Sequence, residues 1–291
     1  MEDSDILEKV RRIEIKARGI SNQLFAGAYH SAFKGRGMKF SEVREYLPGD
    51  DIRTIDWNVT ARFNHPYVKV FEEERELTMM LLVDISKSGQ FGSSDHDKKT
   101  LMAEMAGVLA FSAILNNDNA GILFFSDKVE KYIPPKKGKP HILRIIRECL
   151  VTEPKGQGTN LNAALEYFSN IQKKRCIMFL VSDFMAGNFE TALRIASRKH
   201  DVVALNIFDP RERELPSIGL VQMQDMETGE LKWIDTSSEK VRTQFARTAL
   251  MHRHYLDDLF RKTGIDYTHV ATNDNYFLKL SHLFQRRGKA R

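Results

Sequence analysis

The sequence predicts an α/β fold with a mainly parallel central sheet, helices on both of its faces, and an N-terminal helix and loop-and-hairpin appendage. Three observations lead to this prediction. Short runs that are apolar throughout, such as residues 79–83 and 176–181, are typical of strands buried on both faces. Segments with apolar residues at helical spacing separate these runs. Parallel strands need crossover connections of this kind, which cover both faces of the sheet.

The first 75 residues are expected to form the appendage. Up to about residue 18, apolar residues recur at mainly helical spacing, which predicts an amphipathic helix. Residues 33–75 are punctuated by glycine and proline and are dense in Arg, Asp and Glu, which predicts loops and a hairpin. Their apolar residues are too few for a separate core. We therefore expect an appendage at residues 1–75 and the α/β domain at residues 76–291.

From residue 76 onward, strands and helices alternate. The expected strands are residues 76–83, 120–125, 129–133, 176–181, 202–208 and 266–271. The expected helices are residues 99–115, 140–150, 161–171, 189–199, 239–263 and 276–284. A hairpin of residues 220–224 and 231–234 is expected to turn at residues 227–230. Because ligands of parallel sheets bind beyond the carboxyl ends of the strands, we expect the chemistry directly after Val83, near Gly158 and directly after Val181.

The composition indicates a soluble globular protein. The chain has 291 residues, of which 42% are hydrophobic and 29% charged. Its apolar runs are shorter than the ~20 residues of a membrane span, and its first residues lack the pattern of a secretory signal, so we expect a cytoplasmic protein. Cys149 and Cys176 lie in apolar surroundings without C-x-x-C spacing, which favours buried thiols over a redox or metal role.

Positive charge gathers at the C-terminal end. The net charge of +5 is modest, but Arg286, Arg287, Lys289 and Arg291 form a short basic tail. Such a tail could contact nucleic acid, and this gives one alternative function. We favour a solvated terminus and no nucleic acid partner, because no aromatic residues interleave with the tail to stack on bases.

Five oxygen-bearing side chains follow the expected strand ends. The first strand continues into L-L-V-D-I-S-K-S-G, which places Asp84, Ser86 and Ser88 at alternate positions. Thr159 stands at the start of an expected helix, and Asp183 follows a central strand. Alone, each aspartate could be a helix cap or a loop residue, and Thr159 could be a cap. Together, two carboxylates and three hydroxyls predict a site for Mg²⁺, a hard cation that prefers oxygen and keeps several of its waters.

These five residues resemble the metal-ion-dependent adhesion site of the von Willebrand factor A superfamily, which is D-x-S-x-S, then a threonine, then an aspartate. The chain is also similar to the bacterial domain-of-unknown-function family DUF58, which is commonly encoded beside MoxR-type AAA+ ATPases. That similarity depends on R-E-Y-L-P-G-D-D-I-R-T-I-D-W at residues 44–57, T-A-R at 60–62 and V-K-V-F-E-E-E-R at 68–75. One departure is Gly89, where the superfamily often has methionine.

The resemblance implies roles for the five residues. Ser86 and Ser88 would bind the cation directly, Asp84 and Asp183 directly or through water, and Thr159 in either way depending on the state. The ion would be Mg²⁺, or alternatively Mn²⁺ or Ca²⁺. A carboxylate of another protein would complete the shell, while loop movement around the threonine would couple binding to shape. We therefore expect a non-enzymatic interaction module, an adaptor or co-chaperone that works with a MoxR-type AAA+ ATPase and an acidic client.

A metal-dependent hydrolase acting on phosphoesters is the main alternative. It would need a general base or nucleophile beside the cation. The local candidates, His96 and Asp97, are more typical of a solvated loop. The chain contains no G-x-x-x-x-G-K-[ST], H-E-x-x-H or G-x-S-x-G motif, and no small-molecule substrate is evident.

The charged signature of residues 44–75 has two interpretations. We expect Arg53, Asp56, Arg62 and Glu73 to form buried ion pairs that lock the appendage to the sheet, with Trp57 as an anchor. Alternatively, Arg53, Arg62 and Glu73 belong to a docking face for the ATPase, because paired surface charges supply specificity and orientation.

Overall fold

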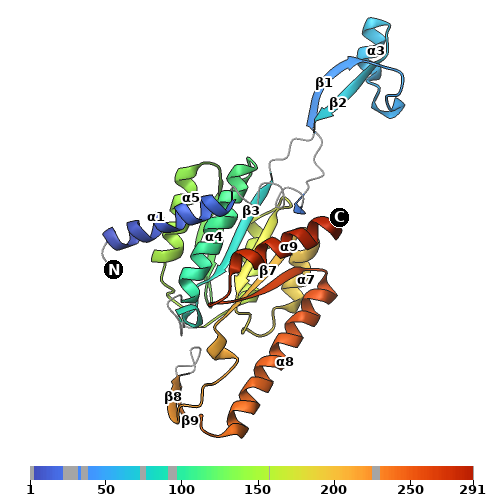
Figure 1. Cartoon of the computed structure of the whole chain (residues 1–291). Coiled ribbons are helices and arrows are strands. Elements are labelled where there is room, and N and C mark those ends of the chain that lie inside the picture. Colours follow the sequence, from blue (N-terminus) through green and yellow to red (C-terminus); the bar gives the residue numbers. More distant parts are fainter. Residues whose placement is uncertain are drawn as a thin grey trace. The chain divides into compact units, whose positions relative to one another are not determined.

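The computed structural model describes residues 3–21, 32–33, 39–72, 77–90, 97–156, 158–224 and 230–290. The chain divides into two compact units (Figure 1). One unit consists of Met1–Phe33 with Leu77–Arg291, and the other of Lys34–Glu76. The expected division at residue 75 placed the N-terminal helix in the appendage. In the structure this helix belongs to the larger unit instead. The apolar stripe of this helix, α1 (Asp3–Ile20), packs into the core of the larger unit.

The larger unit is built on a six-stranded sheet with the order β10-β7-β6-β3-β4-β5. Its strands are β3 (Thr78–Asp84), β4 (Asn119–Phe125), β5 (Val129–Lys136), β6 (Ile177–Ser182), β7 (Asp201–Phe208) and β10 (Asp266–Ala271). All neighbours pair in parallel except β5, which is antiparallel to β4. From β3 the chain builds one side of the sheet and then returns to build the other, beginning with β6. The carboxyl ends of β3 and β6 therefore form the switch point at which such folds bind ligands.

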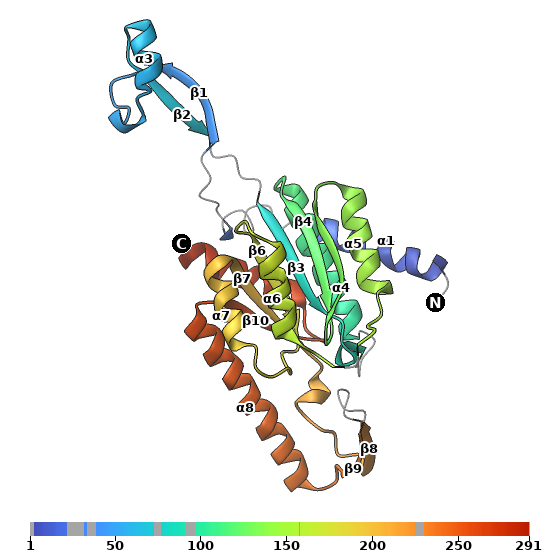
Figure 2. The same cartoon turned by 180° about the vertical axis from the view of Figure 1, so that it is seen from behind.

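Helices cover both faces of this sheet (Figures 1 and 2). One face packs against α1 together with α4 (Lys98–Leu115), α5 (Lys139–Val151) and α9 (Tyr276–Ala290). The other face packs against α6 (Leu161–Ile171), α7 (Glu190–Lys199) and α8 (Glu239–Thr263). β3 serves both cores, because Leu81 points to the first and Leu82 to the second. The three-layer α/β fold class predicted from the sequence, with a mainly parallel central sheet and helices on both faces, is confirmed.

The basic C-terminal segment differs from the expected solvated tail. It is the last part of α9, in which Arg286 and Lys289 are exposed but Arg287 is only 2% exposed. The Arg287 guanidinium donates to the Ala32 carbonyl oxygen at 3.0 Å and to Asp266 Oδ2 at 2.9 Å, and it also pairs with Asp201. The expectation was wrong at Arg287 because its position on α9 follows the buried face of the helix. Arg291 lies outside the described residues.

A hairpin stands apart from the main sheet. β8 (Leu220–Gln224) and β9 (Leu231–Asp235) pair antiparallel, as expected, after a short helix η4 (Pro210–Glu212). The expected turn at residues 227–230 lies outside the described residues apart from its last position. The long helix α8 follows the hairpin. Across the described residues, we find no helix with both the length and the apolar character needed to cross a lipid bilayer.

The smaller unit is a hairpin with two short helices. β1 (Lys39–Glu45) pairs antiparallel with β2 (Tyr67–Glu72), and η2 (Ile52–Thr54) and α3 (Trp57–Phe63) lie between them in sequence. A bidentate ion pair stabilises its first turn, because Arg44 donates to both carboxylate oxygens of Asp50, at 2.7 and 2.8 Å.

The buried ion pairs expected within the charged signature are not found among its described residues. Arg53 and Arg62 are exposed, and Trp57 is 68% exposed. Asp56 instead caps α3 and pairs with Lys69 at 3.4 Å. Within this unit, no residue of η2 or α3 is buried, and pairing of these side chains with the sheet stays a prediction. Glu73 lies outside the described part of the chain.

Candidate metal centre

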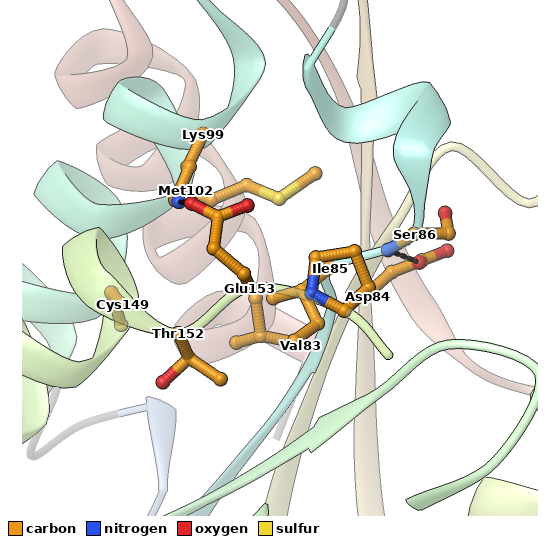
Figure 3. A pocket seen from close by; sticks show the side chains of 10 residues that line it. Val83, Asp84, Ile85, Ser86, Lys99, Met102, Cys149, Thr152 and Glu153 are labelled. Atoms are coloured by element: carbon orange, nitrogen blue, oxygen red, sulfur yellow. Dashed lines mark hydrogen bonds and ion pairs between the residues drawn. The ribbon is translucent and has the colours of Figure 1, made fainter. Parts of the chain in front are cut away.

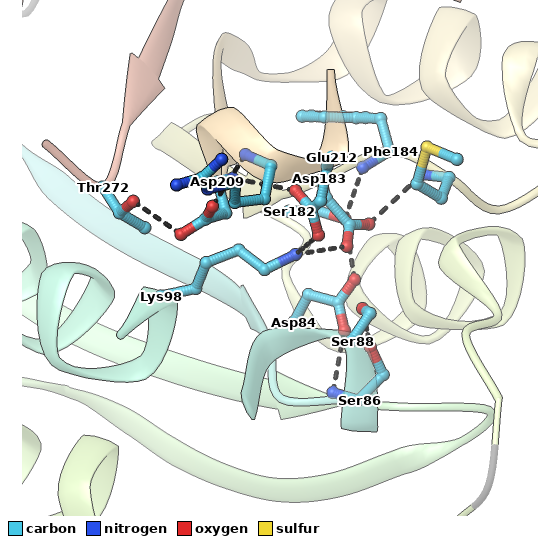
Figure 4. A network of polar contacts seen from close by, with 12 residues as sticks. Asp84, Ser86, Ser88, Lys98, Ser182, Asp183, Phe184, Asp209, Glu212 and Thr272 are labelled. Carbon is cyan, nitrogen blue, oxygen red and sulfur yellow. Dashed lines mark hydrogen bonds and ion pairs between the residues drawn. The ribbon is translucent and has the colours of Figure 1, made fainter. Parts of the chain in front are cut away.

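Asp84 is the last residue of β3 and lies at the switch point of the sheet. Its side chain is only 2% exposed. One carboxylate oxygen accepts from the Ser86 amide at 2.9 Å, and the other from the Ser182 hydroxyl at 2.7 Å (Figure 4). Burial, together with the charge of Asp183, raises the pKa of Asp84 to about 6. The fold therefore holds this carboxylate where its negative charge is costly.

The two serines lie on the turn that follows Asp84. This turn continues into a short helix, η3 (Lys87–Gln90), which brings Ser88 back beside Ser86. Their hydroxyl oxygens are 3.0 Å apart. Ser86 is buried, and Ser88 is partly buried. The alternate spacing of Asp84, Ser86 and Ser88 thus places one carboxylate and two hydroxyls together (Figure 4).

Asp183 follows β6, the neighbour of β3, and the chain fixes it through its backbone. Phe184 has a φ of 56°, in the left-handed region, and its amide donates to the Ser182 hydroxyl at 3.0 Å. The Met185 amide donates to Asp183 Oδ1 at 3.2 Å, and the side chain of Asn206 donates to the Asp183 carbonyl oxygen at 2.9 Å. These contacts hold the second carboxylate close to Asp84.

Lys98, the first residue of α4, was not anticipated at this site. Its side chain is fully buried, and its ammonium lies 3.2 Å from Asp183 Oδ2 and 2.5 Å from Glu212 Oε1. Burial opposes its charge, but Asp183 and Glu212 outweigh burial and raise the pKa of Lys98. A sequence signal existed, because Lys98 shares helical spacing with the buried Leu101 and Met105.

Glu212 extends the polar network to the next strands (Figure 4). It lies on η4 in a capping box, in which the Asp209 amide donates to Glu212 Oε2 at 2.8 Å. The buried Asp209 accepts from the Thr272 hydroxyl at 2.9 Å. Burial raises the pKa of Glu212 against the effect of Lys98. The site thus joins residues from β3, α4, β6, η4 and the end of β10.

Thr159 has a half-buried side chain. Among the described residues, no hydrogen bond links it to the other four predicted ligands. The loop before it is fixed elsewhere, because the Gly156 amide donates to Glu130 Oε1 at 2.9 Å and the Asn160 amide to the Ser126 carbonyl oxygen at 2.8 Å. The cap of α6 is Asn160, whose side chain accepts from the Ala163 amide at 3.0 Å. Thr159 is therefore not the helix cap that we considered as its alternative role.

Asp97, one of the two local candidates for a general base, is a partly exposed residue with a structural role. It caps α4, because its side chain accepts from the Thr100 amide at 2.6 Å. His96 lies outside the described residues.

Acidic groups outnumber basic ones among the described residues linked at this edge. Three carboxylates, those of Asp84, Asp183 and Glu212, accompany the single ammonium of Lys98, which pairs with Asp183 and Glu212. Buried charge of this kind is costly unless it is paired or bound to a metal. Among the described residues, no three His, Cys, Asp or Glu side chains are arranged to hold a metal ion. A cation here would therefore need the serine hydroxyls, and this oxygen donor set fits an ion such as Mg²⁺.

A pocket beside the Asp84 turn is too small for a substrate (Figure 3). Its volume is about 10 Å³, which is room for a single water molecule. It is lined by residues that include Val83, Asp84, Ile85, Ser86, Lys99 and Met102. An ion pair between Lys99 and Glu153, at 2.5 Å, joins two of its lining residues.

The two cysteines are buried, as expected. Burial raises the pKa of each thiol to about 12. Cys176 Sγ lies 3.4 Å from His200 Nδ1, but burial lowers the pKa of this histidine to about 4. The pair is therefore a neutral thiol beside a neutral imidazole, which is the opposite of an activated nucleophile.

Comparisons with known proteins place these features in context. The family model described as "Protein of unknown function DUF58" matches residues 42–255. The uncharacterized protein Rv1480 of Mycobacterium tuberculosis is 28% identical over 279 residues, which is 95% of this chain and 88% of the relative. YeaD of Bacillus subtilis, also uncharacterized, is 27% identical over 111 residues, covering 38% of this chain and 26% of YeaD. A solved aerotolerance-related membrane protein from Bacteroides fragilis matches with a TM-score of 0.50 and 14% identity, over 74% of this chain and 100% of that one. At that identity, the likeness concerns the fold alone.

Proposed function

This chain belongs to the DUF58 family, and we propose that it is a protein–protein interaction module that binds one divalent cation and, through it, a carboxylate of an acidic partner. The observation that carries the proposal is the pair of buried carboxylates, Asp84 and Asp183, beside the hydroxyls of Ser86 and Ser88. They meet at the switch point of the sheet, where α/β folds of this kind bind ligands.

Charge supports a divalent ion in particular. Lys98 is a single ammonium beside the linked carboxylates of Asp84, Asp183 and Glu212, and a dication of the Mg²⁺ type would offset the negative charge that remains. In our proposal Ser86 and Ser88 hold the ion directly, and Asp84 and Asp183 hold it directly or through water. The ion supplies positive charge at an open coordination position, and a partner carboxylate is the ligand of matching charge and hardness.

We extend the proposal to the predicted loop movement around Thr159. The loop before this residue is held by hydrogen bonds to Glu130 and Ser126. In our proposal a shift of this loop brings Thr159 into the ligand set, and partner binding is thereby coupled to the shape of this edge. Glu130→Gln weakens the contacts that fix the loop and is the variant that tests the coupling.

We also propose that the smaller unit, Lys34–Glu76, is the docking element for a MoxR-type AAA+ ATPase. Its exposed Arg53 and Arg62 stand beside exposed large apolar side chains, Ile52, Trp57 and Phe63. Arginine and aromatic side chains are the residues most enriched at protein interfaces. Glu73, the third sequence candidate, keeps the role of a possible charged contact.

A titration with Mn²⁺ tests the cation part of the proposal. Isothermal titration calorimetry on the wild type is expected to give one ion per chain. Asp84→Asn should weaken binding at least tenfold, whereas Asp5→Asn, a matched change of an exposed aspartate on α1, should leave it unchanged. Equal affinity in the wild type and Asp84→Asn, or no binding in the wild type, would contradict the proposal. Metal-dependent turnover of a phosphodiester that disappears in Asp84→Asn would support the hydrolase instead.

A further inference from the structure

The hairpin and the first half of α8 form an extension with little support from the rest of the chain. We call the arm the described residues 218–224 and 230–255. None of residues 239–255 of α8 is buried, and the first buried residue of this helix is Leu256. In Figures 1 and 2 the arm extends from the end of the sheet where β3 terminates, which is the end that carries Asp84.

The hairpin of the arm exposes an apolar face. Trp233 lies opposite Gln222, Leu220 opposite Asp235, and Leu231 opposite Gln224. Because side chains alternate along a strand, Leu220, Leu231 and Trp233 share one face of the hairpin. All three are more than half exposed, and Trp233 is 65% exposed. A two-stranded hairpin is marginally stable in water without a surface to pack on, so this face is suited to a partner.

The helical part of the arm adds apolar and basic side chains. Leu250 and Met251 of α8 are exposed. Residues 239–255 contain four basic residues and one acidic residue. The basic residues are Lys240, Arg242, Arg247 and Arg253, and the acidic residue is Glu239. A second copy of this chain would bring the same positive helix, which disfavours self-association through this surface. Charge complementarity instead selects a partner that is acidic and carries apolar residues.

The arm is continuous with the candidate metal centre. Burial lowers the pKa of His252 of α8, and the charge of Asp183 and the backbone of its neighbour Phe184 both act against that shift. Arg213 follows η4, and its guanidinium carbon lies 3.1 Å from the centre of the Phe208 ring. Burial lowers the pKa of Arg213, and the charges of Arg253 and Glu212 also act on this pKa. A segment that places a carboxylate at the cation would therefore extend along α8, which carries these basic residues.

From this geometry we infer that the arm is the second part of the partner-binding surface and takes an acidic, amphipathic segment of another protein. Apolar residues of that segment pack on Trp233, Leu231 and Leu220, and its acidic residues face the basic residues of α8. The inference deepens the proposed function and rests on it for the position of the partner carboxylate. The contribution of the arm to affinity does not itself require the cation.

The test uses a synthetic peptide of alternating Glu and Leu residues as the probe, with the full chain as the receptor. The chain has two tryptophans, so Trp57→Phe leaves Trp233 as the only tryptophan, whose emission can be excited selectively over that of tyrosine. Binding should shift Trp233 emission to the blue, and anisotropy of a labelled peptide gives the dissociation constant. The same peptide with Lys in place of Glu, a single-stranded DNA oligonucleotide and phosphatidylglycerol vesicles are the comparison ligands.

Two arm variants and one matched control define the outcome. Trp233→Ser and Arg247→Glu should each weaken binding of the acidic peptide about tenfold. Leu278→Ser, a change of an exposed apolar residue on α9, should not. Far-ultraviolet circular dichroism verifies that each variant is folded. EDTA and Asp84→Asn should weaken binding separately, in addition to the effect of the arm variants.

The outcomes separate this inference from the proposed function. If EDTA abolishes binding but both arm variants bind as the wild type does, the cation site stands and the arm inference fails. If the arm variants weaken binding but neither EDTA nor Asp84→Asn has an effect, the arm inference stands and the cation proposal fails. If the arm is instead needed for DNA binding, vesicle binding or dimerisation, and the acidic peptide does not bind, the inference is overturned.

Discussion

Two buried clusters of charge lie at the two ends of the same sheet: the amino edge, where the parallel strands begin, and the carboxyl edge, where they end. The two clusters differ in which charge is buried. At the amino edge, Arg287 is buried while its partners Asp201 and Asp266, the first residues of β7 and β10, remain partly exposed. At the carboxyl edge, Asp84 and Asp183 are buried along with Lys98. Water can therefore stabilise the carboxylates of the amino edge, but it has little access to those of the carboxyl edge.

This difference separates a structural ion cluster from a candidate binding site. The Arg287 cluster is satisfied from within the chain, since the guanidinium has a carbonyl oxygen and two carboxylates as acceptors and stacks on Phe33. The Asp84 cluster has surplus negative charge and a raised Asp84 pKa. Strongly perturbed groups in such positions are typical of functional sites. Changing one edge at a time shows whether a divalent cation compensates for the lost charge there.

The largest effect is expected at Lys98. Lys98→Met leaves three linked carboxylates without their ammonium, which should lower the free energy of unfolding by about 4 kcal/mol in EDTA. Because a divalent cation replaces the lost positive charge, Mg²⁺ should stabilise this variant more than the wild type. Urea denaturation with and without Mg²⁺ measures both quantities. Lys99→Met, a change of the neighbouring lysine that pairs with Glu153 near the surface, should cost less than about 1 kcal/mol.

The corresponding change at the amino edge should not respond to metal. Arg287→Met removes the shared partner of Asp201 and Asp266 and should cost about 3 kcal/mol, somewhat less than at Lys98, because these carboxylates can still reach water. Mg²⁺ should restore none of this loss. Recovery by Mg²⁺ equal to that of Lys98→Met would contradict the distinction between the two edges. Arg286→Met, at an exposed position on the same helix, is the control.

Removing the Asp84 charge should separate binding from stability. At a free Mg²⁺ concentration 100 times the dissociation constant, the wild type should gain about 2.7 kcal/mol. Asp84→Asn should gain almost nothing. In EDTA, however, the variant should be at least as stable as the wild type, because it no longer buries that negative charge. A variant that is unstable in EDTA and fully rescued by Mg²⁺ would show that the carboxylate is not a ligand.

A smaller, pH-dependent effect is expected from His200, which precedes β7 at the amino edge. Burial lowers the pKa of His200 to about 4, below the 6.5 of an unfolded histidine. The stability that it contributes is present above pH 6.5 and is lost progressively as the pH falls toward 4. His200→Phe should flatten the stability curve in this window in EDTA. Parallel curves for the variant and the wild type would show that His200 is not held neutral.

The sheet and its helices could be predicted because their signals are local. Apolar runs in the sequence predicted β3, β6 and β7, and apolar residues at helical spacing predicted α4 and α8. The layers and the switch point of the sheet could be inferred from the order of these elements. The assignment of α1 to the appendage was wrong because its partners on α4 and α5 lie about 90 residues or more away in sequence. Nothing near α1 in the sequence indicates which core its apolar stripe joins.

The site was predicted only in part, and for the same reason. The spacing of Asp84, Ser86 and Ser88 is local, and Asp183 follows from the strand order, so the structure brings these four together. Lys98 was not predicted as a site residue, because a lysine at the start of a helix is ordinarily exposed. Its partner Glu212 lies 114 residues away in sequence. Thr159 matches the motif, but its position depends on a loop that Glu130 and Ser126 fix.

Anomalous diffraction from crystals soaked in Mn²⁺ tests the central claim most directly. The account predicts one Mn²⁺ peak at the carboxyl edge, within direct ligand distance of the Ser86 and Ser88 hydroxyl oxygens, with Asp84 and Asp183 beside it and Lys98 still paired with Glu212. A well-ordered Asp84 turn with no Mn²⁺ peak at saturating concentration, or with the Lys98 ammonium in the place of the ion, would contradict it.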